Sequence, residues 1–154
     1  MAIDLELLAV EIAKPAYVGM NDVQIAGAIN AATYTVSQDI PTDAAIMALI
    51  NTDNLDWGEL VGVAEGVISS TAPKRKRAIT LRELLNTVTP LEVGADNVWW
   101  SRITDLLALL VADGIISSAG KTAFEALRVR QAPFWQFFGH RELEWSDVAA
   151  ARAL

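Results

Sequence analysis

The chain has 154 residues, of which 53% are hydrophobic, and it carries a formal net charge of −7 at pH 7. A chain of this length can bury a substantial core as one domain, and its composition is typical of a folded globular protein. The sequence contains no cysteine, which excludes disulfides and thiolate metal sites.

The charge is unevenly spread along the chain. Residues 1–70 hold one lysine and ten acidic residues, a balance of −9, whereas residues 71–154 hold eleven basic and nine acidic residues, a balance of +2. The acidic first half argues against general binding to nucleic acid, and the asymmetry permits head-to-tail contacts between copies. Because Asp4, Glu6 and Glu11 interrupt the apolar residues near the start, we expect no secretory signal and a cytosolic site of synthesis.

The first half of the sequence predicts four helices and one extended segment. Pro15 ends the first helix, and Asn21 with Gln24 three residues later forms a capping box for the second. Alternating apolar and polar residues within Thr33–Ile40 favour an extended segment. The predicted helices are Ile3–Lys14, one that begins at Asn21, Asp43–Ile50 with Thr42 as its cap, and one near Leu55–Ser69, while Tyr17 enters the core from the connection Pro15–Met20.

The second half predicts four further helices, a helical turn and a basic loop. Ser70–Arg77 is interpreted as a polar connection, and Thr80 with Glu83 forms a capping box for a helix over Leu81–Val88. The remaining elements are the helix within Asp96–Gly114, a helix from Ser117 or Ser118 to about Arg130, an apolar turn at Pro133–Phe138, an extended Arg141–Trp145 and a last helix Asp147–Ala153 capped by Ser146.

The stretch Asp96–Gly114 is the longest and most apolar periodic segment. Its apolar residues, Leu107 among them, form two adjacent stripes, which predicts a helix buried over most of its circumference. Arg102 and Asp105 interrupt it, and the uncharged run that follows is too short to cross a membrane. We therefore predict a mainly α fold, one compact orthogonal multi-helix domain over residues 1–154 around a central buried helix at 96–113. Thr33–Val36 and Glu142–Trp145 are candidates for a minor two-stranded β pairing.

A run of four basic residues, Lys74, Arg75, Lys76 and Arg77, is the sharpest local feature. Such a run could grip phosphates, an acidic partner protein or an acidic patch on another copy. It could equally be a solvated loop between two helices. No aromatic residues are interleaved to stack on bases, so the run is a candidate site for a protein partner more than for nucleic acid.

Four aromatic residues stand together near the C-terminus: Phe134, Trp135, Phe137 and Phe138. Rings of this kind can anchor an interface between subunits. They can also seal the C-terminal segment onto the core, and the residues alone leave both interpretations open. We select Phe134, Trp135 and Phe138 as candidate partner-binding residues.

Two patterns of titratable residues have structural explanations beside chemical ones. His140, the only histidine, follows a glycine in a turn, and we expect it at the surface or at a helix cap. Asp53, Asp56 and Glu59 could share a helix face and hold a hard cation, or they could simply complement the helix dipole. We predict no catalytic residue, no metal site and no cofactor.

Three glycines, Gly58, Gly62 and Gly66, recur at every fourth position. They could form a groove that another helix approaches closely, within the chain or between subunits. They do not match a dinucleotide-binding or phosphate-loop fingerprint. Because interior glycines destabilise a helix by about 1 kcal/mol each, some packing gain or a break in the helix should offset them.

Two stretches at opposite ends of the chain resemble small proteins encoded among the virion genes of tailed bacteriophages. Ala13–Val36 shows their opening pattern: an early helix, a Tyr-x-Gly/Met turn, Asp-x-x-Ile-Ala-x-x-x-Asn and an extended Thr/Val segment. Gly139–Ala153 shows their closing pattern: a glycine turn, an extended piece and a Val-Ala-x-Ala-Arg helix. The middle of the chain matches only in helix order. The resemblance implies a phage origin and a place in or beside the virion, and it transfers no functional residue.

The function that we expect is that of a non-enzymatic virion structural component, an accessory subunit of the head, neck or tail. Its partners would be other virion proteins or copies of itself, with no role for a membrane. The alternative is a small phage regulator or inhibitor of host defence that binds a host protein. A third hypothesis, an enzyme, would need His140 or the three acidic residues to lie in a pocket that perturbs their titration.

Overall fold

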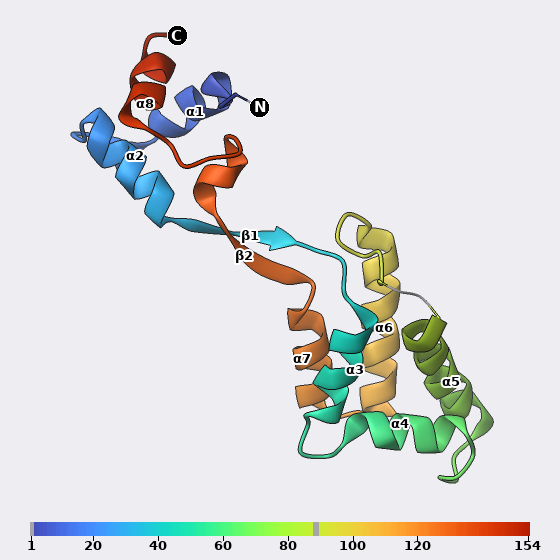
Figure 1. Ribbon diagram of the computed structural model, residues 1–154. Helices are drawn as coiled ribbons and strands as arrows, with labels where there is room; N and C mark the ends of the chain where they lie inside the picture. The colour runs from blue at the N-terminus through green and yellow to red at the C-terminus, as the bar shows by residue number, and fades with distance from the viewer. Residues whose placement is uncertain (1, 88–89) are drawn as a thin grey trace. The chain divides into compact units, whose positions relative to one another are not determined.

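In the computed structural model, the described residues, 2–87 and 90–154, fold into eight α-helices and two short antiparallel strands (Figure 1). The prediction of a mainly helical fold with a minor two-stranded pairing is therefore confirmed. Within these residues no helix is long and apolar enough to cross a membrane. The elements are α1 (Leu5–Ile12), η1 (Pro15–Tyr17), α2 (Asp22–Ala31), β1 (Thr33–Ser37), α3 (Thr42–Ile50), α4 (Asp56–Ala64), α5 (Ala72–Thr87), α6 (Asn97–Ala112), α7 (Ser118–Ala126), β2 (Val129–Pro133), η2 (Phe134–Phe137) and α8 (Trp145–Arg152).

The chain divides into two compact units, whereas the sequence predicts a single domain. The terminal unit contains both ends of the chain, Met1–Val36 and Gln131–Leu154. The middle unit is the continuous segment Ser37–Arg130. Each unit has its own cluster of buried hydrophobic residues, and the two boundaries fall within β1 and β2.

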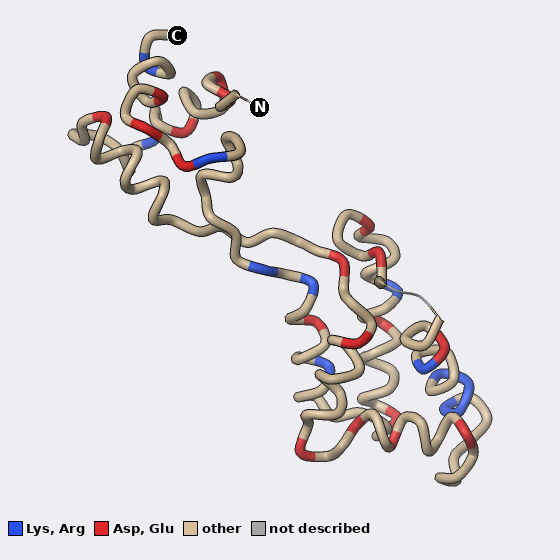
Figure 2. The backbone as a smooth tube through the Cα atoms, in the orientation of Figure 1, with Lys and Arg blue, Asp and Glu red and all other residues tan. Residues whose placement is uncertain are grey.

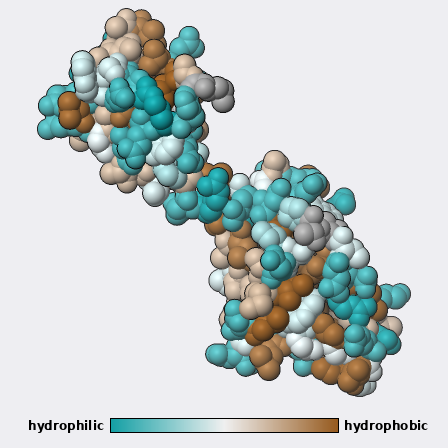
Figure 3. Space-filling view, in the orientation of Figure 1, coloured by the Kyte–Doolittle hydropathy of each residue, from teal (hydrophilic) through white to brown (hydrophobic). Residues whose placement is uncertain are grey.

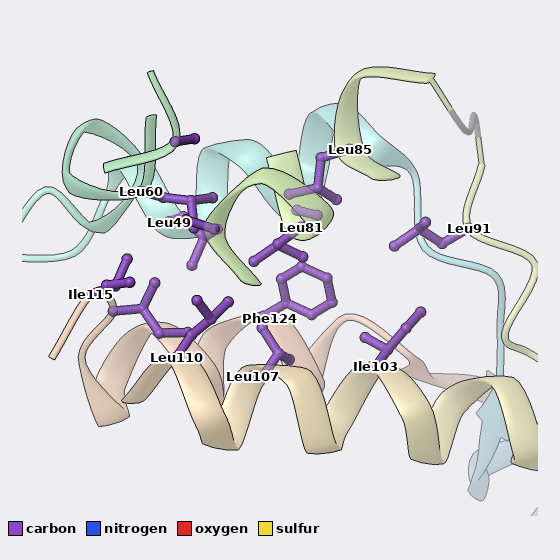
Figure 4. Packing of buried hydrophobic residues seen from close by; sticks show 14 of the residues in the cluster. Leu49, Leu60, Leu81, Leu85, Leu91, Ile103, Leu107, Leu110, Ile115 and Phe124 are labelled. Atoms are coloured by element: carbon purple, nitrogen blue, oxygen red, sulfur yellow. The ribbon is translucent and has the colours of Figure 1, made fainter. Parts of the chain in front are cut away.

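The middle unit is built around α6, as the periodicity of Asp96–Gly114 predicts. Asp96 caps the helix, because its Oδ1 accepts a hydrogen bond from the Trp99 N–H at 2.8 Å, and Gly114 follows its end with a φ of +74°. Leu107 is fully buried, and burial of such a side chain stabilises a fold by roughly 1.5–3 kcal/mol. Figure 4 shows the inward face of α6 meeting side chains from α3, α4, α5 and α7: Ile103, Leu107 and Leu110 point toward Leu49, Leu60, Leu81, Leu85 and Phe124.

A separate core holds the terminal unit together, so α6 is not the packing partner of every helix, as the sequence led us to expect. Leu8 of α1, Ile29 of α2 and Val148 of α8 are fully buried in this core. Phe138, which follows η2, is also buried there. The helix α8 packs against both α1 and α2, and the three helices bury their apolar stripes in this shared core and not against α6.

Tyr17 packs half-buried against the terminal core from the turn η1, close to the position that the sequence predicts. Its hydroxyl donates a hydrogen bond to Glu11 Oε1 at 2.9 Å. Burial, together with this hydrogen bond, raises the pKa of Tyr17 to about 12. The phenol is therefore protonated at neutral pH, as its role as a donor requires.

Polar contacts between residues far apart in sequence complete the terminal unit. Asn30 of α2 bonds to the backbone of Leu143 in both directions: its Nδ2 donates to the carbonyl oxygen and its Oδ1 accepts from the N–H, each at 2.9 Å. Arg152 of α8 pairs with Asp22 at 3.0 Å and donates to the Met20 carbonyl at 3.0 Å. These contacts join α2 to the C-terminal segment, and Asn30 gives the chain at Leu143 the backbone partners that a strand would otherwise supply.

The second strand lies where the sequence predicts a helix. The helix α7 ends at Ala126 instead of continuing to about Arg130, and the next residues form β2. The predicted pairing of Thr33–Val36 with Glu142–Trp145 is therefore wrong, because β1 pairs with Val129–Pro133. A pairing between segments this far apart depends on tertiary contacts that neither segment shows locally.

The helix α5 also begins earlier than predicted. It starts at Ala72, so Ser70–Arg77 is not a loop. Thr80, the predicted cap, lies inside the helix, where its Oγ1 donates to the Lys76 carbonyl at 2.8 Å. Val88, the predicted end of this helix, lies outside the described residues.

Of the caps predicted for α2, α3 and α8, the first is confirmed and the other two are wrong. The capping box of Asn21 and Gln24 is confirmed, with both hydrogen bonds present at 2.9 and 3.0 Å. Thr42 is the first residue of α3 and not its cap, a position that Pro41 occupies. The last helix, α8, is capped by a box that joins Glu144 and Asp147, and Ser146 lies within the helix.

Candidate interaction surfaces

The four basic residues lie on the first turns of α5 (Figure 2). This is an unfavourable place for cations, because the free N–H groups at the start of a helix create a positive potential. Adjacent like charges add to the cost. Acceptors elsewhere in the middle unit, a carboxylate for Arg77 and a helix-end carbonyl for Arg75, offset this cost.

Arg77 forms a two-pronged ion pair with Asp113, the residue that follows α6 as its C-cap. Its Nε lies 2.6 Å from Oδ2 and its Nη2 lies 2.7 Å from Oδ1. The hydrogen bonds from Arg77 lower the pKa of Asp113 and outweigh the opposing effect of burial, with a further lowering from the charge of Lys74. Parallel hydrogen bonds between a guanidinium and a carboxylate are geometrically specific. Arg77 therefore ties α5 to the end of α6 and is not available to a partner.

Arg75 caps the C-terminus of α4. Its Nε donates to the Ala64 carbonyl at 3.3 Å, where unpaired carbonyls and the negative end of the helix dipole favour a cation. Gly66 adopts a φ of +77°, and a Cβ there would lie 2.9 Å from Arg75 Nη2. A glycine thus ends α4 at Ala64, well before the predicted Ser69, and leaves room for the guanidinium.

Close packing within the chain explains why Gly62, the middle one of the three spaced glycines, has no side chain. A Cβ on Gly62 would lie 2.6 Å from Cδ1 of Ile68, which folds back from the turn after α4. Gly58 has nothing within 4 Å of its Cβ position. The groove at Gly62 is therefore filled by the chain's own side chain and is not open to another helix.

Arg75 is exposed but donates to the end of α4, so Lys74 and Lys76 are the residues of the basic run that we assign to an external partner. Within the described part of the chain neither lysine forms an ion pair. Lys76 is exposed and Lys74 is half-buried close to Asp113. Two of the four basic side chains, Arg75 and Arg77, therefore bond within the chain itself.

The aromatic cluster is divided between core and surface. Phe138 is buried, and Phe134 and Trp135 are half-buried against the terminal core. Phe137 is the exposed ring, with 52% of its surface accessible, although its edge or face contacts the rings of Tyr34, Phe134 and Phe138 at centroid distances of 5.5–6.2 Å. Of the four aromatic residues, Phe137 is the best placed to meet a partner, and the sequence-based selection omits it.

A surface hollow of about 480 Å³ lies beside Phe137, lined also by Asp4, Gln136 and His140. His140 is exposed, which confirms the expected surface position. The Asp4 carboxylate caps α1 by accepting from the Leu7 N–H at 3.0 Å. Protein–protein interfaces commonly combine an aromatic side chain with polar groups around it, as at this surface hollow.

The acidic residues Asp53, Asp56 and Glu59 do not form a cation site. Asp56 is 1% exposed, and its Oδ2 accepts a hydrogen bond from the Ser117 hydroxyl at 2.7 Å. Ser117 Oγ accepts in turn from the Gly120 N–H at 3.0 Å, which confirms the predicted cap of α7. Asp56 thus joins the starts of α4 and α7. In residues 2–87 and 90–154, no group of three or more His, Asp or Glu side chains is arranged to hold a metal.

The helix α3 presents a third surface, which the sequence does not indicate. Its side chains Met47 and Ile50 are exposed, and Figure 3 shows apolar surface gathered over this helix.

Leu55, which precedes α4, is 64% exposed with a φ of +50°, the only positive φ of a non-glycine residue in the described chain. A leucine in the left-handed region is strained, so the surrounding turn must hold it there.

No protein-family model matches this sequence, and the comparisons find no similar curated protein and no similar solved structure.

Proposed function

We propose that the protein is a non-enzymatic structural component of a tailed-phage virion, an accessory subunit of the head, neck or tail. It acts through protein–protein contacts with other virion proteins or with copies of itself. It is synthesised in the host cytoplasm and incorporated into the particle, and no catalytic residue or cofactor takes part.

The observation that carries this proposal is the meeting of the two phage-like stretches in one unit. Asn30, the last residue of the Asp-x-x-Ile-Ala-x-x-x-Asn pattern, bonds to Leu143 in the closing stretch. Arg152, the last residue of the Val-Ala-x-Ala-Arg pattern, pairs with Asp22, the first residue of the Asp-x-x-Ile-Ala-x-x-x-Asn pattern. The residues that carry the resemblance hold each other in place, which supports a structural role for both patterns.

The surfaces that we assign to partner contacts are Lys74 with Lys76 on α5, and Phe137 beside its hollow. Both lie outside the two hydrophobic cores. An exposed aromatic ring is a common anchor at the centre of an interface, whereas exposed lysines steer an acidic partner and fix its orientation.

Mass spectrometry of purified particles of the encoding phage tests the proposal. We expect the chain at a fixed stoichiometry relative to the major virion proteins, and a replication protein from the same lysate, as a control, should be absent. If the chain is abundant in the infected cell but missing from the particle, the proposal is wrong, and a regulator that binds a host protein becomes the better explanation.

The double substitution Lys74→Gln and Lys76→Gln tests the basic contact without disturbing the fold. It leaves the Arg77–Asp113 pair and the Arg75 cap intact, whereas neutralising all four residues would destabilise the middle unit. We expect reduced incorporation into particles with an unchanged circular dichroism spectrum. Arg102→Gln, which removes an exposed cation from α6 that forms no ion pair within the described residues, is the control and should be incorporated normally.

A further inference from the structure

The strand β1 has one edge paired with β2 and one edge free. Gln38 N–H donates to the Arg128 carbonyl at 2.5 Å, and Phe134 N–H donates to the Ala32 carbonyl at 2.8 Å. These two bonds fix a continuous antiparallel register, in which residues of even number in β1 bond to β2. The N–H and C=O groups of Thr33, Thr35 and Ser37 therefore point away from β2. In the described chain the sheet contains no third strand to receive them.

The free edge of β1 lacks the features that usually prevent edge-to-edge pairing. The eight residues 31–38, AATYTVSQ, contain no charge and no proline, and the register shows no bulge. Proteins commonly protect an exposed edge with lysine, proline or a bulge. The other edge of the ribbon has such protection, because β2 carries Arg130 and Pro133.

We propose that β1 pairs antiparallel with β1 of a second copy, about a two-fold axis at Thr35, to form a four-stranded sheet. In this register Thr35 lies opposite the second copy's Thr35, and Thr33 lies opposite its Ser37. The outward backbone groups of these residues then exchange both hydrogen bonds of each pair, as closely spaced antiparallel pairs do.

The side chains of β1 are complementary to themselves in this register. On one face, the pairs are Thr35 with Thr35 and Thr33 with Ser37, which are hydroxyl pairs that favour antiparallel strands. On the other face, Tyr34 lies opposite the second copy's Val36, an aromatic side chain against a β-branched one, and both are half-buried already. No two residues that lie opposite each other in this register carry like charges.

The same pairing through β2 is much less favourable. Its outward positions are Val129, Gln131 and Pro133, and proline has no N–H to donate. Arg130 would also lie diagonally close to the Arg130 of the second copy. Because a two-stranded ribbon is marginally stable and sheets gain stability with three or more strands, pairing through β1 supplies what the ribbon lacks.

This self-association does not rest on the proposed place in the virion. A dimer in solution tests the β1 edge, and mass spectrometry of particles tests the virion role, so either can fail without the other. The chain has a mass of 16.6 kDa, and sedimentation equilibrium of the full chain over a range of concentrations should show twice that mass.

Charge substitution at Thr35 is the decisive test, because Thr35 faces its own copy across the two-fold axis. Thr35→Lys alone and Thr35→Asp alone should each weaken dimerisation by on the order of tenfold or more, since like charges would lie opposite each other. An equimolar mixture of the two variants should restore the dimer as a heterodimer. Val129→Lys, which places the same charge on the β2 edge, should dimerise as the wild type does.

A further control separates charge from the loss of a local contact, because Thr35 Oγ1 also accepts from Gln131 Nε2 at 2.9 Å. Gln131→Ala removes that hydrogen bond without adding charge and should leave the dimer intact. The proposal is overturned if the wild type remains at the monomer mass at every concentration. It is also overturned if the dimer survives Thr35→Lys, which would place the interface on another surface such as α3.

Discussion

The terminal and middle units are stabilised in different proportions by apolar burial and by specific polar contacts. In the described residues, the middle unit buries a cluster of seventeen hydrophobic residues, and the terminal unit buries a cluster of eight. The smaller core is supplemented by contacts that join the two ends of the chain, above all Asn30 with Leu143 and Arg152 with Asp22. A unit with a small core therefore depends on individual polar residues to a degree that a unit with a larger core does not.

The two units also differ in whether they are formed by one continuous segment of the chain or by two. The middle unit is continuous from Ser37 to Arg130, whereas the terminal unit needs segments from both ends. Bringing distant segments together costs loop-closure entropy. The pairing of β1 with β2 holds those segments close together, so a folded middle unit lowers the loop-closure entropy that the terminal unit must lose.

The largest effect should come from the same substitution made once in each core. Phe124→Ala in the middle unit and Phe138→Ala in the terminal unit each remove a buried ring, at a cost of roughly 3–5 kcal/mol. We expect Phe138→Ala to raise amide hydrogen exchange in α1, α2 and α8 while α6 stays protected. Phe124→Ala should expose the whole chain, because the terminal unit loses the loop closure that the middle unit supplies.

The control for this comparison is Phe137→Ala, one residue from Phe138 but exposed. It should lower the free energy of unfolding by about 1 kcal/mol, clearly less than Phe138→Ala, because it loses ring contacts with Tyr34, Phe134 and Phe138 but opens no buried cavity. Equal exchange in both units after Phe138→Ala would show that they unfold as one cooperative structure.

A smaller effect should follow from removing the two hydrogen bonds between Asn30 and the Leu143 backbone. Asn30→Ala leaves the N–H and the carbonyl of Leu143 without their partners, which should cost about 1–3 kcal/mol. Chemical denaturation measures the loss, and hydrogen exchange at Leu143 locates it. Gln136→Ala, at an exposed position in the same unit, is the neutral control. A loss no larger than that of the control would mean that the small core suffices by itself.

The features that the sequence predicts well are those that a short segment determines by itself. The capping box of Asn21 and Gln24 and the buried helix from Asp96 to Gly114 depend on residues within a few turns, so periodicity and cap chemistry are enough to find them. The same local reasoning misplaces the cap at Thr80, because a Thr-x-x-Glu pattern is equally compatible with the interior of a long helix.

The features that the sequence does not predict depend on contacts between distant segments. Nothing in Val129–Pro133 identifies β1 as its partner, and nothing in the basic run shows that Asp113 lies beside Arg77. The candidate site changes for the same reason. Arg75 and Arg77 become structural residues, Phe138 becomes a core residue, and Phe137 emerges as the exposed ring.

The smallest expected difference between the units is in the pH dependence of stability, because the described residues of each unit include a two-pronged Arg–Asp pair. Arg77 with Asp113 lies in the middle unit, and Arg141 with Asp147 lies in the terminal unit, with N–O distances of 2.8 and 3.0 Å. Hydrogen bonds from the arginine lower the pKa of each aspartate. A carboxyl whose pKa is lower in the folded state stabilises the fold above its ordinary pKa near 3.9, and this contribution disappears as the pH falls through the folded value.

Asp113→Asn and Asp147→Asn should therefore be less stable than the wild type at about pH 7, with a difference that shrinks as the pH approaches about 2. Denaturation of all three proteins at several pH values measures this difference. We expect the larger difference for Asp113→Asn, because Asp113 is 8% exposed and Arg77 29%, against 12% and 43% for Asp147 and Arg141, and solvent screens the more exposed pair more strongly. If Asp147→Asn has the larger effect instead, polar ties contribute more to the terminal unit than their exposure implies, and its dependence on them is stronger than the two cores alone indicate.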